Sequence, residues 1–112
     1  MTNDRDKKYV RHILDAISDI AEFLNGVSEA DFKSSGLVQS AVMRKIEIIG
    51  EASKRISLET KLAYSDIEWK KAAGMRDVLI HDYFGVDIQG VWNTVQENLP
   101  ELKLQLEKLI SG

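Results

Sequence analysis

The chain has 112 residues, no cysteine and a formal net charge of −3. This length suits one domain over residues 1–112, and the lack of cysteine excludes disulfides and thiolate metal sites. No apolar run approaches the roughly 20 residues that span a bilayer, and the charged N-terminus lacks the apolar core of a signal peptide. We therefore expect a cytoplasmic protein with no membrane partner. The acidic balance argues against a general nucleic-acid coat protein, but it permits an enzyme that contacts RNA through a few local cations.

The first helix is expected over residues 9–24, in a chain rich in helix-forming residues with one proline. Its apolar positions fall on one face, as in an amphipathic helix: they are Val10, Ile13, Leu14, Ile17, Ile20, Ala21 and Leu24. Asn25 and Gly26 should end this helix, because both tolerate a left-handed conformation. Residues 28–35 are predicted to be a polar connector with room for one helical turn.

A second long helix is expected over residues 37–56, with apolar residues on more than one stripe. This pattern is typical of a central helix, or of a helix shared with a second subunit. Arg44, Glu51 and Arg55 would lie nearly one above another on its surface. Such rows are usually solvated ion pairs of little energy; the alternative is that Arg44 or Arg55 faces an RNA-binding cleft. Residues 57–65 are predicted to be the next connector, with room for a short helix.

Two further helices complete the prediction. Ser65 and Glu68 match a capping box, which predicts a helix starting there and running to about residue 80. Asp87 is the predicted N-cap of the last helix, in which Pro100 should produce a kink or a restart after Asn98. The predicted fold is all-α, a small bundle of four long helices with one or two short ones.

Residues 74–85 hold the chemically distinctive side chains Arg76, His81 and Tyr83. In a straight helix that turns about 100° per residue, Arg76 and Tyr83 lie within about 20° of each other, and His81 points about 140° away. Asp77 and His81 would then form an ordinary helical ion pair, and Tyr83 would be a core residue. On this interpretation the segment is structural.

The same side chains also suit phosphate-ester chemistry, if the helix breaks near His81 or if two subunits face each other across a cleft. Arg76 would bind a phosphate and stabilise the additional negative charge of the transition state. His81 would accept a proton from a ribose 2′-hydroxyl or deliver one to the leaving 5′-oxygen, because an imidazole titrates near neutral pH. We expect no metal and no other cofactor, because His12 and His81 are far apart in a chain without cysteine. His12 is expected at the surface.

The string Arg-x4-His-x-Tyr at residues 76–83 resembles the signature of HEPN-domain ribonuclease toxins. It is most similar to the HepT branch of the HepT–MntA toxin–antitoxin systems. Residues 48–55 resemble the second-helix segment of that family, and Trp69 and residues 98–103 also fit. The resemblance therefore covers nearly the whole chain.

This resemblance implies an all-helical HEPN homodimer whose paired motifs share one cleft. Such a protein would be a toxin that cleaves RNA, with tRNA as a candidate substrate, as a metal-independent endoribonuclease. Arg76 and His81 would be the catalytic residues. Tyr83 would receive AMP from a minimal nucleotidyltransferase antitoxin, and this AMPylation would silence the toxin.

Three more residues are candidates for supporting this site, namely Arg44, Glu51 and Asp77. Many relatives carry asparagine where this chain has Asp77, and the carboxylate would either weaken RNA binding or orient His81. The alternative function is a non-catalytic helical homodimer that binds and regulates a nucleotidyltransferase, with Arg76 and His81 at the interface. A nucleotide-binding module is disfavoured, because the chain has no glycine-rich phosphate loop.

Overall fold

The computed structural model describes residues 3–75, 77 and 87–111, so the predictions for Arg76, His81 and Tyr83 fall outside the described residues. In chain order the helices are α1 (Asp4–Phe23), α2 (Glu29–Ser34), α3 (Gly36–Arg55), α4 (Leu58–Ala63), α5 (Trp69–Ala73), α7 (Ile88–Asn93), the π-helical turn η1 (Thr94–Asn98) and α8 (Leu99–Ser111). The described residues contain no strand, which confirms the all-α prediction. None of the helices within these ranges is long and apolar enough to cross a membrane.

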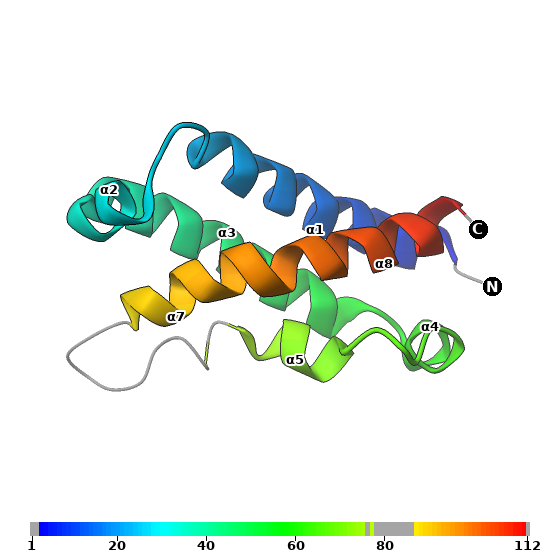
Figure 1. The fold of residues 1–112 in the computed structure, drawn as a ribbon. Coiled ribbons are helices and arrows are strands. Elements are labelled where there is room, and N and C mark those ends of the chain that lie inside the picture. The colour runs from blue at the N-terminus through cyan, green and yellow to red at the C-terminus, as the bar shows by residue number, and fades with distance from the viewer. Residues whose placement is uncertain (1–2, 76, 78–86, 112) are drawn as a thin grey trace.

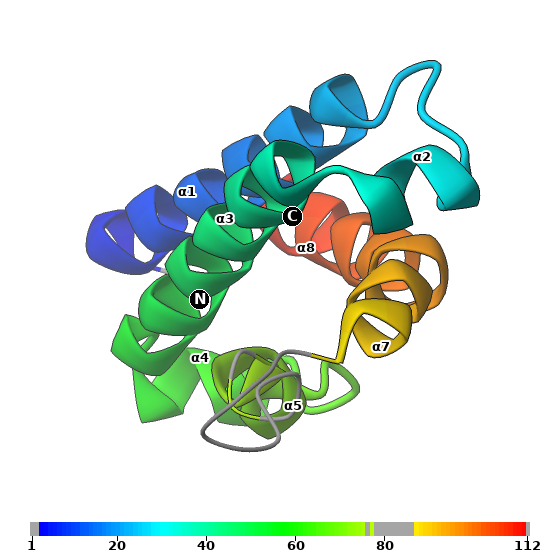
Figure 2. The same ribbon diagram turned by 90° about the vertical axis from the view of Figure 1, so that its left-hand side faces the viewer.

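The central element is α3, which packs against α1, α2 and α5 (Figures 1 and 2). The helix α1 also packs against α8. Together α1, α3 and α8 bury a continuous set of aliphatic side chains: Val10, Ile13, Ile17, Ile20, Val42, Ile46, Ile49, Leu102, Leu106 and Leu109. Most apolar positions of α3 are therefore covered by its neighbours within one subunit, as expected for a central helix, whereas Leu37 at its start is exposed.

The first helix begins earlier than the apolar pattern indicated, because Asn3 caps it. The Asn3 side-chain oxygen accepts a hydrogen bond from the Asp6 backbone N–H at 2.8 Å. At the other end the helix stops as predicted, since Gly26 adopts a positive φ of 77° that a side chain would oppose.

The capping box predicted at Ser65 and Glu68 is wrong. Residues 64–67 form a turn, and α5 begins at Trp69 with no side-chain cap on its first N–H groups. The turn is held by Trp69, whose indole N–H donates to the Tyr64 carbonyl at 3.1 Å, and by burial of Ile67. These tertiary contacts override the local capping signal.

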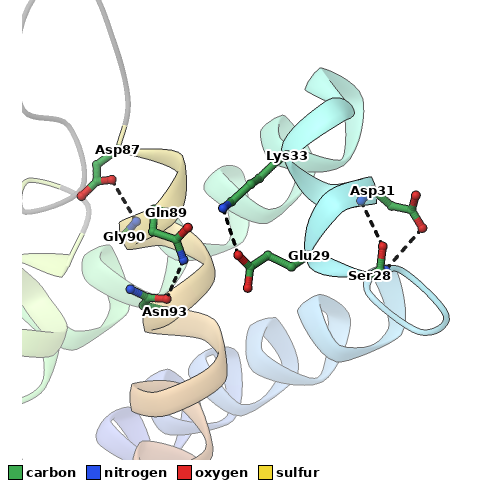
Figure 3. Close-up of polar contacts among 8 residues, drawn as sticks. All are labelled: Ser28, Glu29, Asp31, Lys33, Asp87, Gln89, Gly90 and Asn93. Carbon is green, nitrogen blue, oxygen red and sulfur yellow. Dashed lines mark hydrogen bonds and ion pairs between the residues drawn. The ribbon is translucent and has the colours of Figure 1, made fainter.

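Two other helix starts are capped by side chains, as Figure 3 shows. At α2, Ser28 Oγ accepts a hydrogen bond from the Asp31 N–H at 3.1 Å, and Asp31 Oδ2 accepts one from the Ser28 N–H at 3.4 Å. These two reciprocal bonds form a capping box at the start of α2. At α7, Asp87 Oδ1 accepts from the Gly90 N–H at 2.9 Å, which confirms Asp87 as the predicted N-cap.

Pro100 lies in the first turn of α8, directly after the π-helical turn η1. Proline has no N–H to donate, and its ring would collide with the carbonyl four residues earlier in an α-helix. The wider turn of η1 relieves this conflict without breaking the run from α7 to α8. The new α-helix starts at Leu99, which agrees with the predicted restart after Asn98.

Candidate functional site

A groove of about 460 Å³ runs along the exposed side of α3, with α1 on one wall and the end of α5 on the other. Its lining residues are Tyr9, His12, Arg44, Glu47, Ile48, Gly50, Glu51, Ala52, Lys54, Arg55, Ala73 and Asp77. The three candidate supporting residues, Arg44, Glu51 and Asp77, therefore share one groove.

The floor of the groove is a charged face of α3. Arg44 and Arg55 lie about 16 Å apart along this helix, because an α-helix rises about 1.5 Å per residue. The Arg44 guanidinium lies 4.0 Å from Glu47, and the Arg55 guanidinium lies 3.9 Å from Glu51. Pairs this long between exposed side chains contribute little energy. A phosphate could therefore compete for either guanidinium at small cost.

The second wall depends on a close contact between α3 and α5 at Gly50. A Cβ atom at Gly50 would lie 3.1 Å from the Ala73 carbonyl oxygen, which is tighter than ordinary van der Waals contact. The absence of a side chain lets the α5 backbone approach α3 directly. Ala73 and Asp77 reach the groove as a consequence of this approach.

The first wall carries the aromatic pair Tyr9 and His12 from α1. Their ring centroids are 6.1 Å apart with an interplanar angle of 87°, an edge-to-face contact. His12 is exposed, as predicted, and it also lines the groove. The sequence reasoning missed Tyr9 as a groove residue. A usable signal was present, because Arg5, Tyr9 and His12 occur at the helical spacings of four and three residues.

Two arginines from different helices act on the phenol of Tyr9. Interaction with Arg5 lowers the pKa of Tyr9, and this effect exceeds the increase caused by partial burial. Interaction with Arg55 lowers the pKa of Tyr9 further. The Arg5 guanidinium carbon lies 5.8 Å from the Tyr9 ring centroid. The α1 wall is thus an aromatic surface surrounded by cations.

Around the sequence Arg-x4-His-x-Tyr, the structure describes the residues up to Met75 and one residue within the sequence, Asp77. Met75 is buried, and Asp77 is exposed in the groove. The roles of Arg76, His81 and Tyr83 stay predictions from the sequence. What the described residues contribute is the groove that Asp77 lines.

Two other features of the described ranges bear on the choice of site. No group of three or more His, Cys, Asp or Glu side chains there could hold a metal ion. A second hollow, of about 630 Å³, lies beside α5 and is lined by Lys61, Lys70 and Lys71 among others. Asp77, the described residue of the 76–83 segment, lines the groove on α3 and not this hollow, so the groove is the candidate site.

Fold and site define a class of protein: a small all-helical bundle with a cation-bearing groove, which is lined in part by Asp77 from the sequence Arg-x4-His-x-Tyr. The family of HepT-like ribonucleases matches residues 13–109. The chain belongs to this HepT-like ribonuclease family.

The relatives fit this assignment. A Thermococcus cleftensis protein named "Probable ribonuclease HepT" is 47% identical over 103 residues, covering 92% of this chain and 94% of that protein. A Caldanaerobacter subterraneus protein named "Putative RNase" is 38% identical over 104 residues, covering 93% of each chain. A Methanocaldococcus jannaschii protein, named as a gamma-glutamylcyclotransferase and putative RNase, is 44% identical over 104 residues. The match covers 93% of this chain but spans 47% of that longer protein. No solved structure matches the chain.

Proposed function

We propose that the protein is the toxin of a toxin–antitoxin system, a metal-independent endoribonuclease that cleaves RNA, with tRNA as a candidate substrate. Membership of the HepT-like ribonuclease family supports the reaction class. The observation that carries the assignment to this site is the groove on α3, which collects Arg44, Lys54 and Arg55 and includes Asp77 from the motif segment.

Arg76 and His81 are the proposed catalytic residues. The ribose 2′-oxygen attacks phosphorus and the bond to the 5′-oxygen breaks, leaving a 2′,3′-cyclic phosphate and a 5′-hydroxyl. His81 mediates the transfer of the proton from the 2′-hydroxyl to the leaving oxygen. Arg76 binds the phosphate bidentately, through two parallel hydrogen bonds, and stabilises the negative charge of the transition state.

The described groove residues would hold the RNA on either side of the reacting phosphate. Arg44, Lys54 and Arg55 supply positive charge along α3, and Glu51 orients Arg55 when no RNA is bound. The Asp77 carboxylate would either orient His81 or repel a phosphate bound near Asp77. In a homodimer, which we also propose, the two copies of the motif would share one cleft.

Incubating purified protein with total RNA or tRNA in the presence of EDTA tests this assignment. Wild type should cleave, and Arg76→Ala and His81→Ala should each lower the cleavage rate by about 100-fold or more. Arg11→Ala is the matched control for the arginine, because Arg11 is exposed on α1 and is not among the residues that line the groove. Equal RNA integrity and equal growth on overexpression for wild type and His81→Ala would support the alternative, a non-catalytic homodimer that binds a nucleotidyltransferase.

Tyr83 is the proposed site of AMPylation by a partner minimal nucleotidyltransferase. An attached adenylate adds bulk and negative charge beside a site built to receive RNA phosphate. After co-expression with that enzyme, the intact mass should rise by whole AMP units, and Tyr83→Phe should show no rise. Tyr64→Phe is the control, because Tyr64 is not a groove residue. A rise of the same size in Tyr83→Phe would place the modification on another side chain.

A further inference from the structure

We propose that Tyr9 forms a base-stacking subsite on the α1 wall of the groove, where a nucleobase of single-stranded RNA stacks on the phenol ring and Arg55 binds the adjoining phosphate. The inference rests on the proposed ribonuclease function and adds to it a determinant of how RNA is positioned. It makes Tyr9 a binding and positioning residue, separate from the proposed catalytic pair.

The Tyr9 ring packs against the core at the edge of the groove. It is half-buried, so its inner edge is fixed. Along α1 it lies between Arg5 and His12, with the guanidinium carbon 5.8 Å and the imidazole centroid 6.1 Å from its own centroid. A ring that is already immobilised loses little entropy when a base stacks on it.

Two arginines act on the phenol of Tyr9. Interactions with Arg5, and to a smaller extent with Arg55, lower the pKa of the Tyr9 hydroxyl against the effect of burial. Arg5 is on α1 and Arg55 is on α3, so both helices that border the groove place a cation near the ring. Because the Arg5 guanidinium lies over one face of the ring, a base would stack on the part of the ring that lines the groove.

The neighbouring charge favours RNA as the occupant. Arg55 is exposed, and its carboxylate neighbour Glu51 lies 3.9 Å away in an exposed pair that contributes little energy. A phosphate can take that guanidinium while the adjoining base meets the aromatic surface. This combination of an aromatic platform and a backbone-binding cation is the usual way in which proteins hold unpaired nucleotides.

The subsite lies across the groove from Asp77, the described residue of the motif segment. Tyr9 belongs to the α1 wall, and Asp77 lies on the wall formed beyond α5. A nucleotide stacked on Tyr9 would therefore flank the scissile phosphate rather than carry it. Stacking tolerates any base, so Tyr9 should strengthen RNA binding with little sequence preference.

The test uses a fluorescent single-stranded oligoribonucleotide that is 2′-O-methylated at every position, so that binding is measured without cleavage. Tyr9→Leu should raise the Kd about tenfold, because stacking on an aromatic side chain is worth about 1–3 kcal/mol per base. Tyr9→Phe keeps the ring and should retain most of the affinity. For an abasic oligomer of the same length, wild type and Tyr9→Leu should bind equally, and Arg55→Ala should still weaken binding.

Several results would overturn the subsite. One is a folded Tyr9→Leu protein whose Kd for the base-bearing oligomer stays within about twofold of wild type. An equal loss of affinity for the abasic oligomer would be another, because it would place the effect on phosphate contacts. A third is a Tyr9→Leu protein with an unchanged Kd but a changed sedimentation coefficient. This result would indicate that the Tyr9 end of the groove is a contact between copies of the chain. Circular dichroism of each variant verifies folding.

Failure of the subsite and failure of the ribonuclease function remain distinguishable. If both hold, Tyr9→Leu raises KM about tenfold with kcat unchanged, and His81→Ala binds the uncleavable oligomer normally without cutting RNA. If wild type cuts no RNA but Tyr9→Leu still weakens binding, the subsite stands and the nuclease assignment fails. If cleavage is normal and Tyr9→Leu has unchanged KM and Kd, the subsite alone is wrong.

Discussion

At the scale of single residues, Asp6 is a buried charge that joins distant parts of the chain. Its carboxylate accepts hydrogen bonds from the Ser57 backbone N–H at 3.1 Å, from the Ser57 hydroxyl at 2.5 Å and from the Thr60 hydroxyl at 2.5 Å. Burial alone raises the pKa of Asp6, but these hydrogen bonds, together with the charge of Arg5, hold it below the ordinary value of 3.8. The start of α1 is thereby fixed to the start of α4.

The first prediction concerns Asp6→Asn, which removes the charge and turns one acceptor into a donor facing two hydroxyls. We expect a loss of about 2 kcal/mol in the free energy of unfolding at pH 7, since hydrogen bonds to charged groups are worth about 1.5–3 kcal/mol. Because the folded-state pKa is depressed, the stabilisation is complete above the ordinary pKa and is lost as pH falls through the folded value. The difference between wild type and Asp6→Asn should therefore shrink below about pH 4.

Urea unfolding at pH 7 and at pH 3 measures this difference. Asp4→Asn is the control, because Asp4 is an exposed carboxylate in the same helical turn. A difference between wild type and Asp6→Asn that stays constant from pH 7 to pH 3 would contradict the proposed role of the charged form. The network as a whole could not be predicted from sequence, because its partners are 51 to 54 residues apart.

At the scale of elements, the contact between α3 and α5 depends on Gly50. Gly50→Val would place branched carbon atoms against the Ala73 carbonyl, which already lies 3.1 Å from the position of a Cβ atom. We expect a destabilisation of about 2 kcal/mol, within the range for overpacking a close contact. The displaced α5 should also lower RNA cleavage, because Ala73 and Asp77 form the second wall of the groove.

Thermal or urea unfolding, together with the cleavage assay, measures both effects. Gly36→Val provides the comparison, since a Cβ atom at Gly36 meets nothing within 4 Å. If Gly50→Val unfolds with the same free energy as Gly36→Val and cuts RNA at the wild-type rate, the close approach does not shape the site.

The helix starts show which element-level features the sequence could reveal. Asp87 was predictable as an N-cap because its partner, the Gly90 N–H, is three residues away. Ser65 and Glu68 present an equally good local pattern, yet the Trp69 indole and the buried Ile67 keep those residues in a turn. Local chemistry predicts a cap where no tertiary contact competes for the same backbone.

The groove shows how much of the candidate site could be predicted from the sequence. The spacing of Arg44, Glu51 and Arg55 on one helical face was visible in the sequence, and these residues do share the groove. The spacing of Arg5, Tyr9 and His12 places them on one face of α1, but Tyr9 joins the groove only because α1 packs along α3. Periodicity predicts which side of a helix is exposed, but the partner helix decides which exposed residues meet.

At the scale of the whole molecule, a protein of net charge −3 would have to bind the proposed RNA substrate through a local set of cations. Among the described residues, the groove offers three cations, Arg44, Lys54 and Arg55, which are interspersed with the carboxylates of Glu47, Glu51 and Asp77. With no general positive field to attract RNA, binding should depend weakly on salt. For single strands, log K falls with log[salt] by about 0.7 for each neutralised phosphate. These three contacts and the contact proposed for Arg76 therefore predict a slope of about −3.

Anisotropy titrations of the uncleavable oligomer between low and physiological salt give this slope directly. Arg55→Ala should reduce its magnitude by about 0.7, because one phosphate contact is lost. Arg11→Ala should leave it unchanged, since Arg11 is exposed on α1 and is not a lining residue. A wild-type slope much steeper than about −3 would require cations beyond these four. The lysines beside α5, Lys61, Lys70 and Lys71, would be the first to substitute. A slope near zero would mean that the groove holds RNA without ionic contacts, which contradicts the role assigned to its arginines.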